Sequence, residues 1–467
     1  MEGQPSCIFE RYVMTENVLQ LLNKYDVPTP RYTSYPTVPY WDFASLHEKE
    51  WLQMVAHRFK VENGALSIYI HLPFCEKLCT FCACNKRITK NHAVEVPYIS
   101  TVLKEWEMYR KILPGKPTIK EIHLGGGTPT FFTAANLVRL IKGITRDAIL
   151  PEDKEFSVEV HPNYTTEEHL RELANVGFNR VSIGVQDFDP KVQFLINRIQ
   201  SFEQTKEVVD WARKYGYYSI NIDLVYGLPH QTQSSIEYSI DRIKSLVPDR
   251  IAFYSYAHVP WKSKVQRRYT EADLPNAEQK WEMYHRGKWL LEECGFHAIG
   301  MDHFALKDDP LFAAAKNGKL HRNFMGYTTT DNKLLLGLGA SSISDTWNAF
   351  AQNEKEIELY EQKVNDGIFP VVNGHLLNAE DLLIRQHILD LMCHGRTVLN
   401  TPALHAAYIN RCLQSLATLQ DDRLVEVEND RITVTANGKL FVRNICACLD
   451  AHLLQNETPV AAFSRAI

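Results

Sequence analysis

ALSIYIHLPFCEKLCTFCACN, residues 65–85, runs from a strand-like segment straight into a cluster of cysteines. Apolar and polar side chains alternate over residues 65–72, which predicts a β-strand with one apolar and one polar face. Cys75, Cys79, Cys82 and Cys84 follow directly. Cysteines at this spacing are too close together to pair with one another without strain. We therefore expect these thiols to bind a metal ion or a cluster at the end of the strand.

Strand-like and helix-like segments alternate along the next part of the chain. In one helix-like stretch, Leu137, Leu140, Ile141 and Ile144 fall on one face, and Thr133 is the predicted N-cap. Six β-then-α units in series predict an α/β fold, a parallel sheet with right-handed crossovers that closes or nearly closes as a barrel. The predicted strands are 65–72, 120–125, 156–161, 180–185, 218–226 and 250–258.

These strands carry polar side chains at alternate positions. Strands of a fully packed parallel barrel are usually apolar throughout. If helices cover the apolar face, the polar face lines a lumen that holds a polar ligand or water. The alternative is an open antiparallel sheet with an exposed face, which the intervening helices disfavour. The polar positions are Ser67, Tyr69, His71, Glu121, His123, Ser157, Glu159, His161, Asn221 and Asp223.

The cysteine spacing distinguishes two kinds of site. Structural zinc requires four ligands, so Cys84 or a histidine would have to join Cys75, Cys79 and Cys82. An iron–sulfur cube accepts three thiolates and can leave its fourth iron open. Both remain open from spacing alone, and the position after a barrel strand favours the cube.

The segment GGGTPT, residues 125–130, follows the second predicted strand. Loops at the carboxyl ends of barrel strands build binding sites, and glycines let the backbone approach a ligand closely. A nucleotide-phosphate loop is the first alternative, but no Gly-Lys-Ser/Thr follows. A simple tight turn is the second.

Composition places the chain among ordinary globular proteins. Its 467 residues are 45% hydrophobic and 23% charged, with a net charge of −5, so no global basic field favours nucleic acid. The sequence has no apolar run long enough for a membrane span and no signal-peptide layout in residues 1–20. We expect a cytoplasmic protein with reduced thiols. Cys7, Cys294, Cys393 and Cys412 are interpreted as small buried residues.

We expect four parts along the chain. Residues 1–62 form an N-terminal extension that docks on the active site, with an extended, proline-rich segment at 30–43. Residues 63–300 form the partial barrel, and 301–374 complete it. Residues 375–467 form a helix-rich, winged-helix-like domain in which 423–435 is a β-hairpin.

Cys75-x3-Cys79-x2-Cys82 after the first barrel strand resembles the motif of radical S-adenosylmethionine (radical SAM) enzymes. A closer resemblance, to the oxygen-independent coproporphyrinogen III oxidase family, runs from about residue 20 to the C-terminal FSRAI. It implies a partial (β/α)6 barrel that holds a [4Fe-4S] cluster. The segments that carry it are PRYTSYPT (30–37), SIYIHLPFCEKLCTFCACN (67–85), GGGTPT, GFNRVSIGVQDFD (177–189), NIDLVYGLP (221–229), GMDHFA (300–305), HRNF.GYTT (321–329) and RNICACLD (443–450).

The resemblance implies an activity: two propionates of coproporphyrinogen III become vinyl groups in haem biosynthesis, giving protoporphyrinogen IX. A 5′-deoxyadenosyl radical starts the reaction, two S-adenosylmethionine molecules are held, and a low-potential donor such as flavodoxin or ferredoxin supplies electrons. We expect a monomer that binds no nucleic acid.

The resemblance also implies residue roles. Cys75, Cys79 and Cys82 are cluster ligands, whereas Cys84 is characteristic of the family without being a ligand. Contacts of the first S-adenosylmethionine are Tyr69, Gly126, Glu159 and Ile343. Contacts of the second are Phe81, Gly127, Thr128, Gln186, Arg198, Asp223 and Ala257. Catalytic roles fall to Tyr69, Glu159, Phe324 and Ile343. For a substrate with four carboxylates, Arg31 and Arg322 are the candidate basic rim. Each carboxylate or arginine taken singly is equally consistent with a structural ion pair.

Two positions depart from the family pattern: His161 stands where Asp is common, and Met325 where Gln is usual. These departures leave room for a radical SAM relative with another substrate, and a haem-binding chaperone on the same fold is a further alternative. Cys446 and Cys448 suggest either an auxiliary metal site or two packed small residues, and the helix-like RNICACLD favours the latter.

Overall fold

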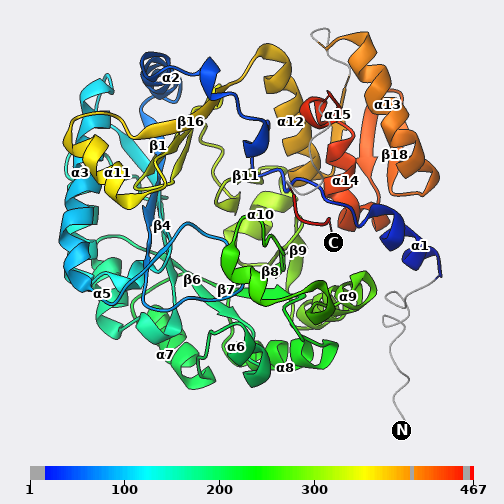
Figure 1. Ribbon diagram of the computed structural model, residues 1–467, viewed down its shortest axis with the longest axis horizontal. Helices are drawn as coiled ribbons and strands as arrows, with labels where there is room; N and C mark the ends of the chain where they lie inside the picture. Colours follow the sequence, from blue (N-terminus) through cyan, green and yellow to red (C-terminus); the bar gives the residue numbers. More distant parts are fainter. Residues whose placement is uncertain (1–15, 400–403, 456–462, 467) are drawn as a thin grey trace.

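The computed structural model describes residues 16–399, 404–455 and 463–466. Its centre is a curved sheet of parallel strands with helices on the outside (Figure 1). The predicted parallel pairing is confirmed, with each strand hydrogen-bonded to the next in the chain. The strands are β1 (Ala65–Leu72), β4 (Thr118–Gly126), β5 (Glu155–Val160), β6 (Arg180–Gln186), β7 (Ser219–Tyr226) and β8 (Arg250–Ser255).

Helices follow the strands in the expected alternation. In the second of them, the predicted apolar stripe is buried and Thr133 caps the helix by accepting a hydrogen bond from the Asn136 amide. The helices are α3 (Glu95–Ile112), α4 (Ala134–Thr145), α5 (Glu167–Asn175), α6 (Pro190–Leu195), α7 (Phe202–Lys214), α8 (Gln233–Lys244) and α9 (Ala277–Glu293).

Short strands extend this sheet at both ends. On the β1 side, β13 (Leu335–Leu338) is parallel, and β14 (Ile343–Asp345), β15 (Ala349–Asn353) and β16 (Val371–Leu376) follow antiparallel. On the β8 side lie β10 (His303–Ala305) and then β9 (His297–Ile299). The 300/301 boundary therefore falls between two paired strands, and the 374/375 boundary falls inside β16.

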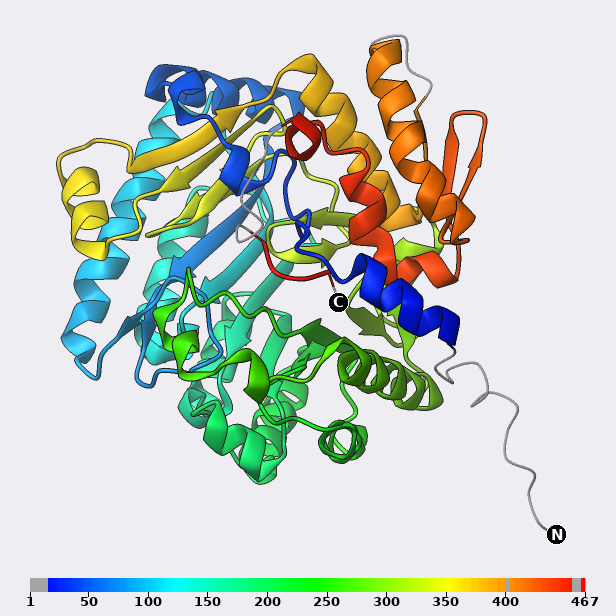
Figure 2. The same cartoon turned by 45° about the vertical axis from the view of Figure 1, so that its right-hand side comes forward.

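The C-terminal module packs on one side of the sheet (Figure 2). The predicted hairpin is confirmed as β18 (Val425–Glu428) and β19 (Arg431–Val434), and β17 (Arg396–Val398) adds a third strand. A separate apolar core fills the module. Its helices are α12 (Ala379–His394), α13 (Ala406–Asp421), α14 (Val442–Ala447) and α15 (Ala451–Gln455).

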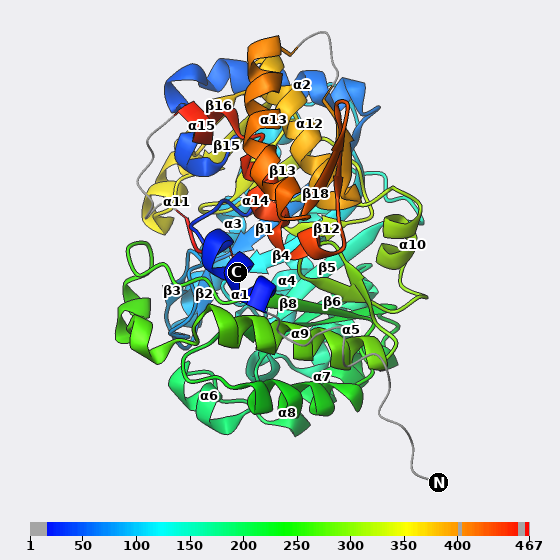
Figure 3. The ribbon, with the colours of Figure 1, turned by 90° about the vertical axis from the view of Figure 1, so that its right-hand side faces the viewer.

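The segment 26–46, here called the lead-in, passes between this module and the sheet (Figures 2 and 3). As expected, residues 30–43 contain no α-helix, and their 3-10 turns begin at Val38 and Phe43. Helices α1 (Glu16–Tyr25) and α2 (Glu48–Val61) flank the lead-in. The side chain of Arg443 is buried and donates to the Thr29 and Pro30 carbonyls, which fixes the path of the lead-in.

The remaining elements are short: β2 (Phe74–Cys75), β3 (Arg87–Ile88), α10 (Pro310–Lys316), β11 (His321–Asn323), β12 (Gly326–Thr328) and α11 (Ile357–Asn365). Within the described ranges, no helix combines the length and the apolar character that crossing a membrane would take.

Candidate active site

The cysteine loop begins at the carboxyl end of β1, and hydrogen bonds to neighbouring segments of the chain fix its shape. Cys75 is buried, Cys79 and Cys82 are half-buried, and Cys84 is exposed. The Thr80 amide donates to the Ile196 carbonyl at 3.0 Å, and the Asn197 amide side chain donates to the Leu78 carbonyl at 2.7 Å. The turn after α6 therefore sets the shape of the loop.

A buried glutamine that sequence reasoning missed holds the other side of the loop. Gln266 is 0% exposed, and its Nε2 donates to the carbonyls of Phe81 at 2.6 Å and Ala257 at 3.2 Å. Its Oε1 accepts from the Val259 amide. No motif marks this glutamine, because its role depends on Phe81, which is distant in sequence.

The glycine loop lies directly against the cysteine strand. The Gly127 amide donates to the Leu72 carbonyl at 2.8 Å, and the Thr128 amide donates to the Phe74 carbonyl at 2.9 Å. A Cβ added at Gly127 would lie 2.7 Å from the Pro73 carbonyl oxygen, so a side chain is excluded there. The Thr128 hydroxyl donates to Cys75 Sγ at 3.3 Å. The close approach predicted for GGGTPT therefore serves contact with the cysteine loop.

A cavity of about 170 Å³ opens between these loops. It brings together most of the residues that sequence analysis singled out. From that set, its lining includes Cys75, Cys79, Phe81, Cys82, Cys84, Gly126, Gly127, Thr128, Glu159, His161, Gln186, Arg198 and Asp223.

Four of the residues assigned to S-adenosylmethionine contact or catalysis lie outside this lining: Tyr69, Ala257, Phe324 and Ile343. Tyr69 stacks on His123, and its hydroxyl bonds His71 Nδ1 at 3.0 Å. Ile343 lies near Tyr69 across the sheet. Gly337 pairs with Tyr69 in register, and the Ile343 backbone is so close to Gly337 that it would clash with a Cβ there. Ala257 offers its carbonyl to Gln266, as described above.

Phe324 lies in an aromatic group away from the cavity. Its ring is edge-on to Trp41 at 6.2 Å and to Phe350 at 5.6 Å between centroids. Trp41 stacks on Phe350 at 5.1 Å, so the lead-in packs against this group.

Two carboxylates in the lumen have opposite pKa shifts. Burial alone would raise the pKa of Glu159, but its hydrogen bond with His123 Nε2 at 3.1 Å and the nearby histidines lower it below its usual value. Burial and the charge of Glu159 raise the pKa of Asp223 to about 6. Glu159 is therefore the ionised acceptor of the pair, and Asp223 is the one that takes up a proton more readily.

The thiols of the cysteine loop also have opposite pKa shifts. Burial raises the pKa of Cys75 to about 11, while the hydrogen bond with Cys84 lowers the pKa of Cys82 to about 6, with Lys86 and Arg198 contributing. Arg198 Nη1 lies 3.6 Å from Cys79 Sγ. Soft sulfur donors with a cation beside them fit a thiolate-ligated iron–sulfur cluster.

As the polar strand faces predicted, the lumen continues from the cavity toward the amino ends of the strands. Its lining there includes Glu121, His123 and Met325. Ion pairs close the lumen at the amino ends of the strands: Arg180 pairs with Glu155, and Arg250 pairs with Asp309 at 2.6 Å. The polar face is therefore neutralised internally at the amino ends of the strands and open to a ligand at the carboxyl ends.

The remaining candidates have defined places. His161 directly follows β5, accepts from the Asn163 amide, and faces the same cavity as Glu159. Arg31 donates to the Ser255 carbonyl at 2.8 Å. Cys446 and Cys448 lie in or against the core of the C-terminal module and point at backbone carbonyls, which agrees with their interpretation as packed residues.

Comparisons with known proteins show the family of this chain. A radical SAM superfamily model matches residues 69–243. The oxygen-independent coproporphyrinogen III oxidase of Escherichia coli (strain K12) is 40% identical over 456 residues, which cover 96% of this chain and 98% of the relative. Its counterpart in Synechocystis sp. is 37% identical over 459 residues, 96% and 97% of the two chains.

A solved structure of the Escherichia coli coproporphyrinogen III oxidase, described as a radical SAM enzyme, superimposes with a TM-score of 0.86. It is 38% identical, and the match covers 93% of this chain and 99% of that chain. The chain belongs to the oxygen-independent coproporphyrinogen III oxidase family.

Proposed function

We propose that this protein converts coproporphyrinogen III to protoporphyrinogen IX without oxygen, turning two propionates into vinyl groups with release of two molecules of carbon dioxide. The observation that carries the proposal is the cavity at the carboxyl ends of the strands. There the cysteine loop, the glycine loop and the carboxylates of β5 and β7 meet. Membership of the family supports the substrate assignment.

Cys75, Cys79 and Cys82 would hold a [4Fe-4S] cluster, and Cys84 would not be a ligand. Bound together, the cluster and S-adenosylmethionine supply a 5′-deoxyadenosyl radical that removes a hydrogen atom from a substrate carbon. Thr128 donates to the Cys75 sulfur, and Arg198 places positive charge beside Cys79. Both contacts favour the thiolate form of the ligands.

Two S-adenosylmethionine molecules fit the same residues in this proposal. Tyr69, Gly126, Glu159 and Ile343 contact the first, and Phe81, Gly127, Thr128, Gln186, Arg198, Asp223 and Ala257 contact the second. Glu159 is ionised by its histidine partner, so it accepts hydrogen bonds from hydroxyl or ammonium groups. Phe81 shields the adenine side from water.

The substrate would lie between the cavity and the lead-in. The lead-in belongs to the proposed N-terminal extension, residues 1–62. The barrel parts 63–300 and 301–374 supply the site, and 375–467 holds the lead-in in place. Arg322 is 7% exposed, and its Nε and Nη1 make no hydrogen bond within the described protein, so it can offer a guanidinium to a carboxylate. Arg31 and the Phe324 group lie along the lead-in.

The proposal includes a cytoplasmic monomer that takes electrons from a low-potential carrier such as flavodoxin or ferredoxin. The exposed position of Cys84 supports the electron-transfer part of the proposal, because the cysteine loop lies near the surface, where a carrier can approach.

An anaerobic turnover tests the proposal. Protein with reconstituted cluster, reductant, S-adenosylmethionine and coproporphyrinogen III is followed by chromatography for 5′-deoxyadenosine and protoporphyrinogen IX. Both products are expected. Deoxyadenosine without decarboxylated porphyrin would assign the radical chemistry to another substrate, and haem binding with neither product would favour a chaperone.

A further inference from the structure

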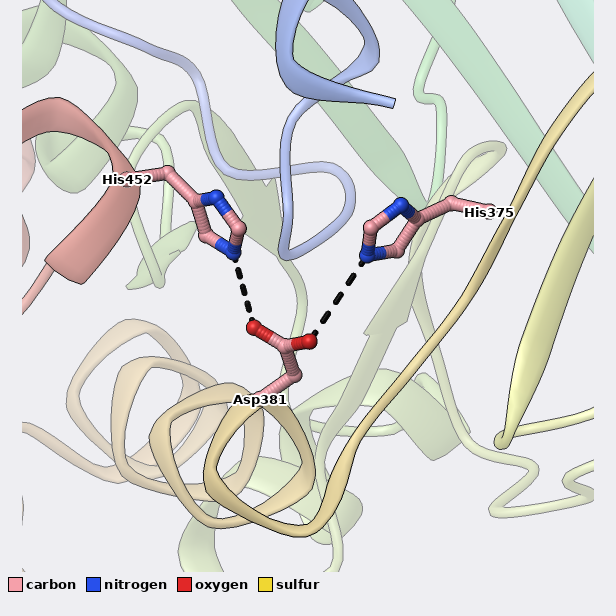
Figure 4. Close-up of side chains that lie close together, drawn as sticks. All are labelled: His375, Asp381 and His452. Carbon is pink, nitrogen blue, oxygen red and sulfur yellow. Dashed lines mark hydrogen bonds and ion pairs between the residues drawn. The ribbon is translucent and has the colours of Figure 1, made fainter. Parts of the chain in front are cut away.

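A second cluster of ligand-type side chains lies away from the cavity. His375 comes from β16, Asp381 from α12 and His452 from α15, and the three side chains converge (Figure 4). One ligand atom from each lies within 4.8 Å of the other two. His452 Nε2 is 2.8 Å from Asp381 Oδ1, and His375 Nε2 is 3.6 Å from Asp381 Oδ2.

Local structure fixes the carboxylate of this cluster. Asp381 occupies the third position of α12, where Oδ2 accepts from the Asn378 amide at 3.1 Å in a capping box. Its side chain is 5% exposed. A buried carboxylate held this way keeps its remaining lone pairs directed at the two imidazoles.

One nitrogen of the cluster has no hydrogen-bond partner in the described protein. The side chain of His375 is 9% exposed, and its Nε2 is buried and aimed at Asp381 beyond hydrogen-bonding distance. Buried polar atoms are rarely left unpaired unless a ligand, water or ion completes them. This atom therefore points to an occupant between His375 and Asp381.

We propose that His375, Asp381 and His452 bind a divalent transition-metal ion of the zinc type, with water at the fourth position. Two imidazole nitrogens and one carboxylate oxygen are a common ligand set for such ions. Bond lengths of about 2.0–2.2 Å place tetrahedral ligands about 3.3 Å apart. His452 Nε2 lies 2.8 Å from Oδ1 and His375 Nε2 lies 3.6 Å from Oδ2, so the site is complete once side-chain rotations bring both nitrogens to that distance from one carboxylate oxygen.

The metal would connect three parts of the molecule. The ligands come from the edge of the sheet, from α12 and from α15, and Tyr40 of the lead-in stacks on His452 at 6.0 Å. The Asp42 amide donates to His375 Nδ1 at 3.1 Å, which places the imidazole proton on Nε2. A metal ion on Nε2 moves that proton to Nδ1, so the Asp42 amide must turn away. Metal binding therefore acts on the lead-in next to Trp41.

Zinc binding by the holoprotein tests this inference independently of turnover. Protein with its iron cluster reconstituted is treated with a mild chelator and titrated with Zn²⁺, and bound zinc and iron are counted by mass spectrometry. Wild type is expected to hold one zinc per chain and to gain several degrees in melting temperature. Asp381→Asn and His452→Gln should lose that zinc and that shift, with iron unchanged.

His394→Gln is the matched control, because His394 is an exposed histidine at the end of α12. It should bind zinc as wild type does. If Asp381→Asn does not fold, His452→Gln carries the comparison, since the His452 side chain is 25% exposed. Equal zinc in wild type and both variants, or none in wild type, would overturn the site and leave a His452–Asp381 hydrogen bond with His375 beside it.

Discussion

At the scale of single residues, His123 explains why two lumen carboxylates behave differently. Alternation along the strands was enough to predict that Glu159 and Asp223 share a face, because strand periodicity is a local property. It did not predict that His123 Nε2 bonds Glu159 while its Nδ1 accepts from the Ser157 hydroxyl at 2.6 Å. That arrangement needs two neighbouring strands in a particular register, and register is set by the whole sheet.

His123→Phe should shift the acid side of the pH profile. Without its histidine partner, the pKa of Glu159 rises, so ionised Glu159 is lost at a higher pH. We expect the acid limb of kcat/KM for S-adenosylmethionine cleavage to move upward by about one pH unit, with the maximum rate less affected. Ser157→Ala should produce a smaller shift in the same direction. An unmoved acid limb would remove His123 from its role in positioning and charging Glu159.

The cysteine assignment makes a second prediction at this scale. Cys79→Ala should lose nearly all cluster iron, because an iron of the cube loses its only protein ligand. Cys84→Ala should retain most of the iron, since Cys84 is exposed at the edge of the cavity. Iron analysis and the visible absorption of anaerobically reconstituted protein compare the two. Equal loss in both variants would show that Cys84 is a ligand.

At the scale of elements, the parallel strands were predictable and the edge strands were not. Strands β1 and β4 to β8 have six or more residues each, and β1, β4, β5 and β7 alternate polar and apolar side chains where they border the lumen. Strands β9, β10 and β14 have three residues each, too few for a period to appear, and they form only because the sheet offers a free edge. The same reason explains β17, which pairs with a hairpin that follows it by about thirty residues in the printed sequence.

Glu105 illustrates how one buried group joins elements. Its carboxyl accepts from the Gly339 amide at 2.9 Å and from the Asn353 and Tyr360 side chains, so α3 is tied to the end of β13, to β15 and to α11. Burial raises the pKa of Glu105 to about 7 against the opposing effect of these donors. The folded state therefore binds a proton that the unfolded chain releases near pH 4.5.

The sign of the resulting pH dependence follows directly. Because the native pKa is raised, the contribution of Glu105 to stability is complete below about pH 4.5 and is lost as the pH rises toward 7. Glu105→Gln removes this titration. Relative to the variant, wild type should lose about 3 kcal/mol of unfolding free energy between pH 4.5 and 7. Denaturant unfolding of both proteins at several pH values measures the difference, and parallel curves would contradict the shift.

At the scale of the whole molecule, the lead-in depends on contacts that span nearly the entire chain. Extended structure at 30–43 was predictable from its prolines, which remove backbone donors. Its location was not, because the partners of the lead-in are Arg443 and residues 464–466. Family resemblance gave Phe324 a catalytic role, and its ring packs edge-on against Trp41 of the lead-in.

Arg443→Lys tests whether these contacts hold the lead-in. Arg443 is 3% exposed and donates to the carbonyls of Thr29, Pro30, Arg465 and Ala466. Lysine has three donors on one nitrogen and cannot reach carbonyls on both sides, so at least two buried acceptors lose their partner. At about 1–3 kcal/mol for each unpaired group, we expect a loss of roughly 3 kcal/mol in the stability of this region.

Limited proteolysis locates the effect. Arg443→Lys should be cut in residues 26–46 much faster than wild type. Cluster iron should stay unchanged, because Gln266 and the turn after α6 hold the cysteine loop. Arg431→Lys, at an exposed position in β19, is the matched control and should resist cleavage like wild type. The KM for the porphyrinogen should rise more than kcat falls, since the lead-in borders the proposed substrate site and not the cluster. Cleavage at an unchanged rate would mean that the stacking of Trp41 and Tyr40 holds the lead-in without Arg443.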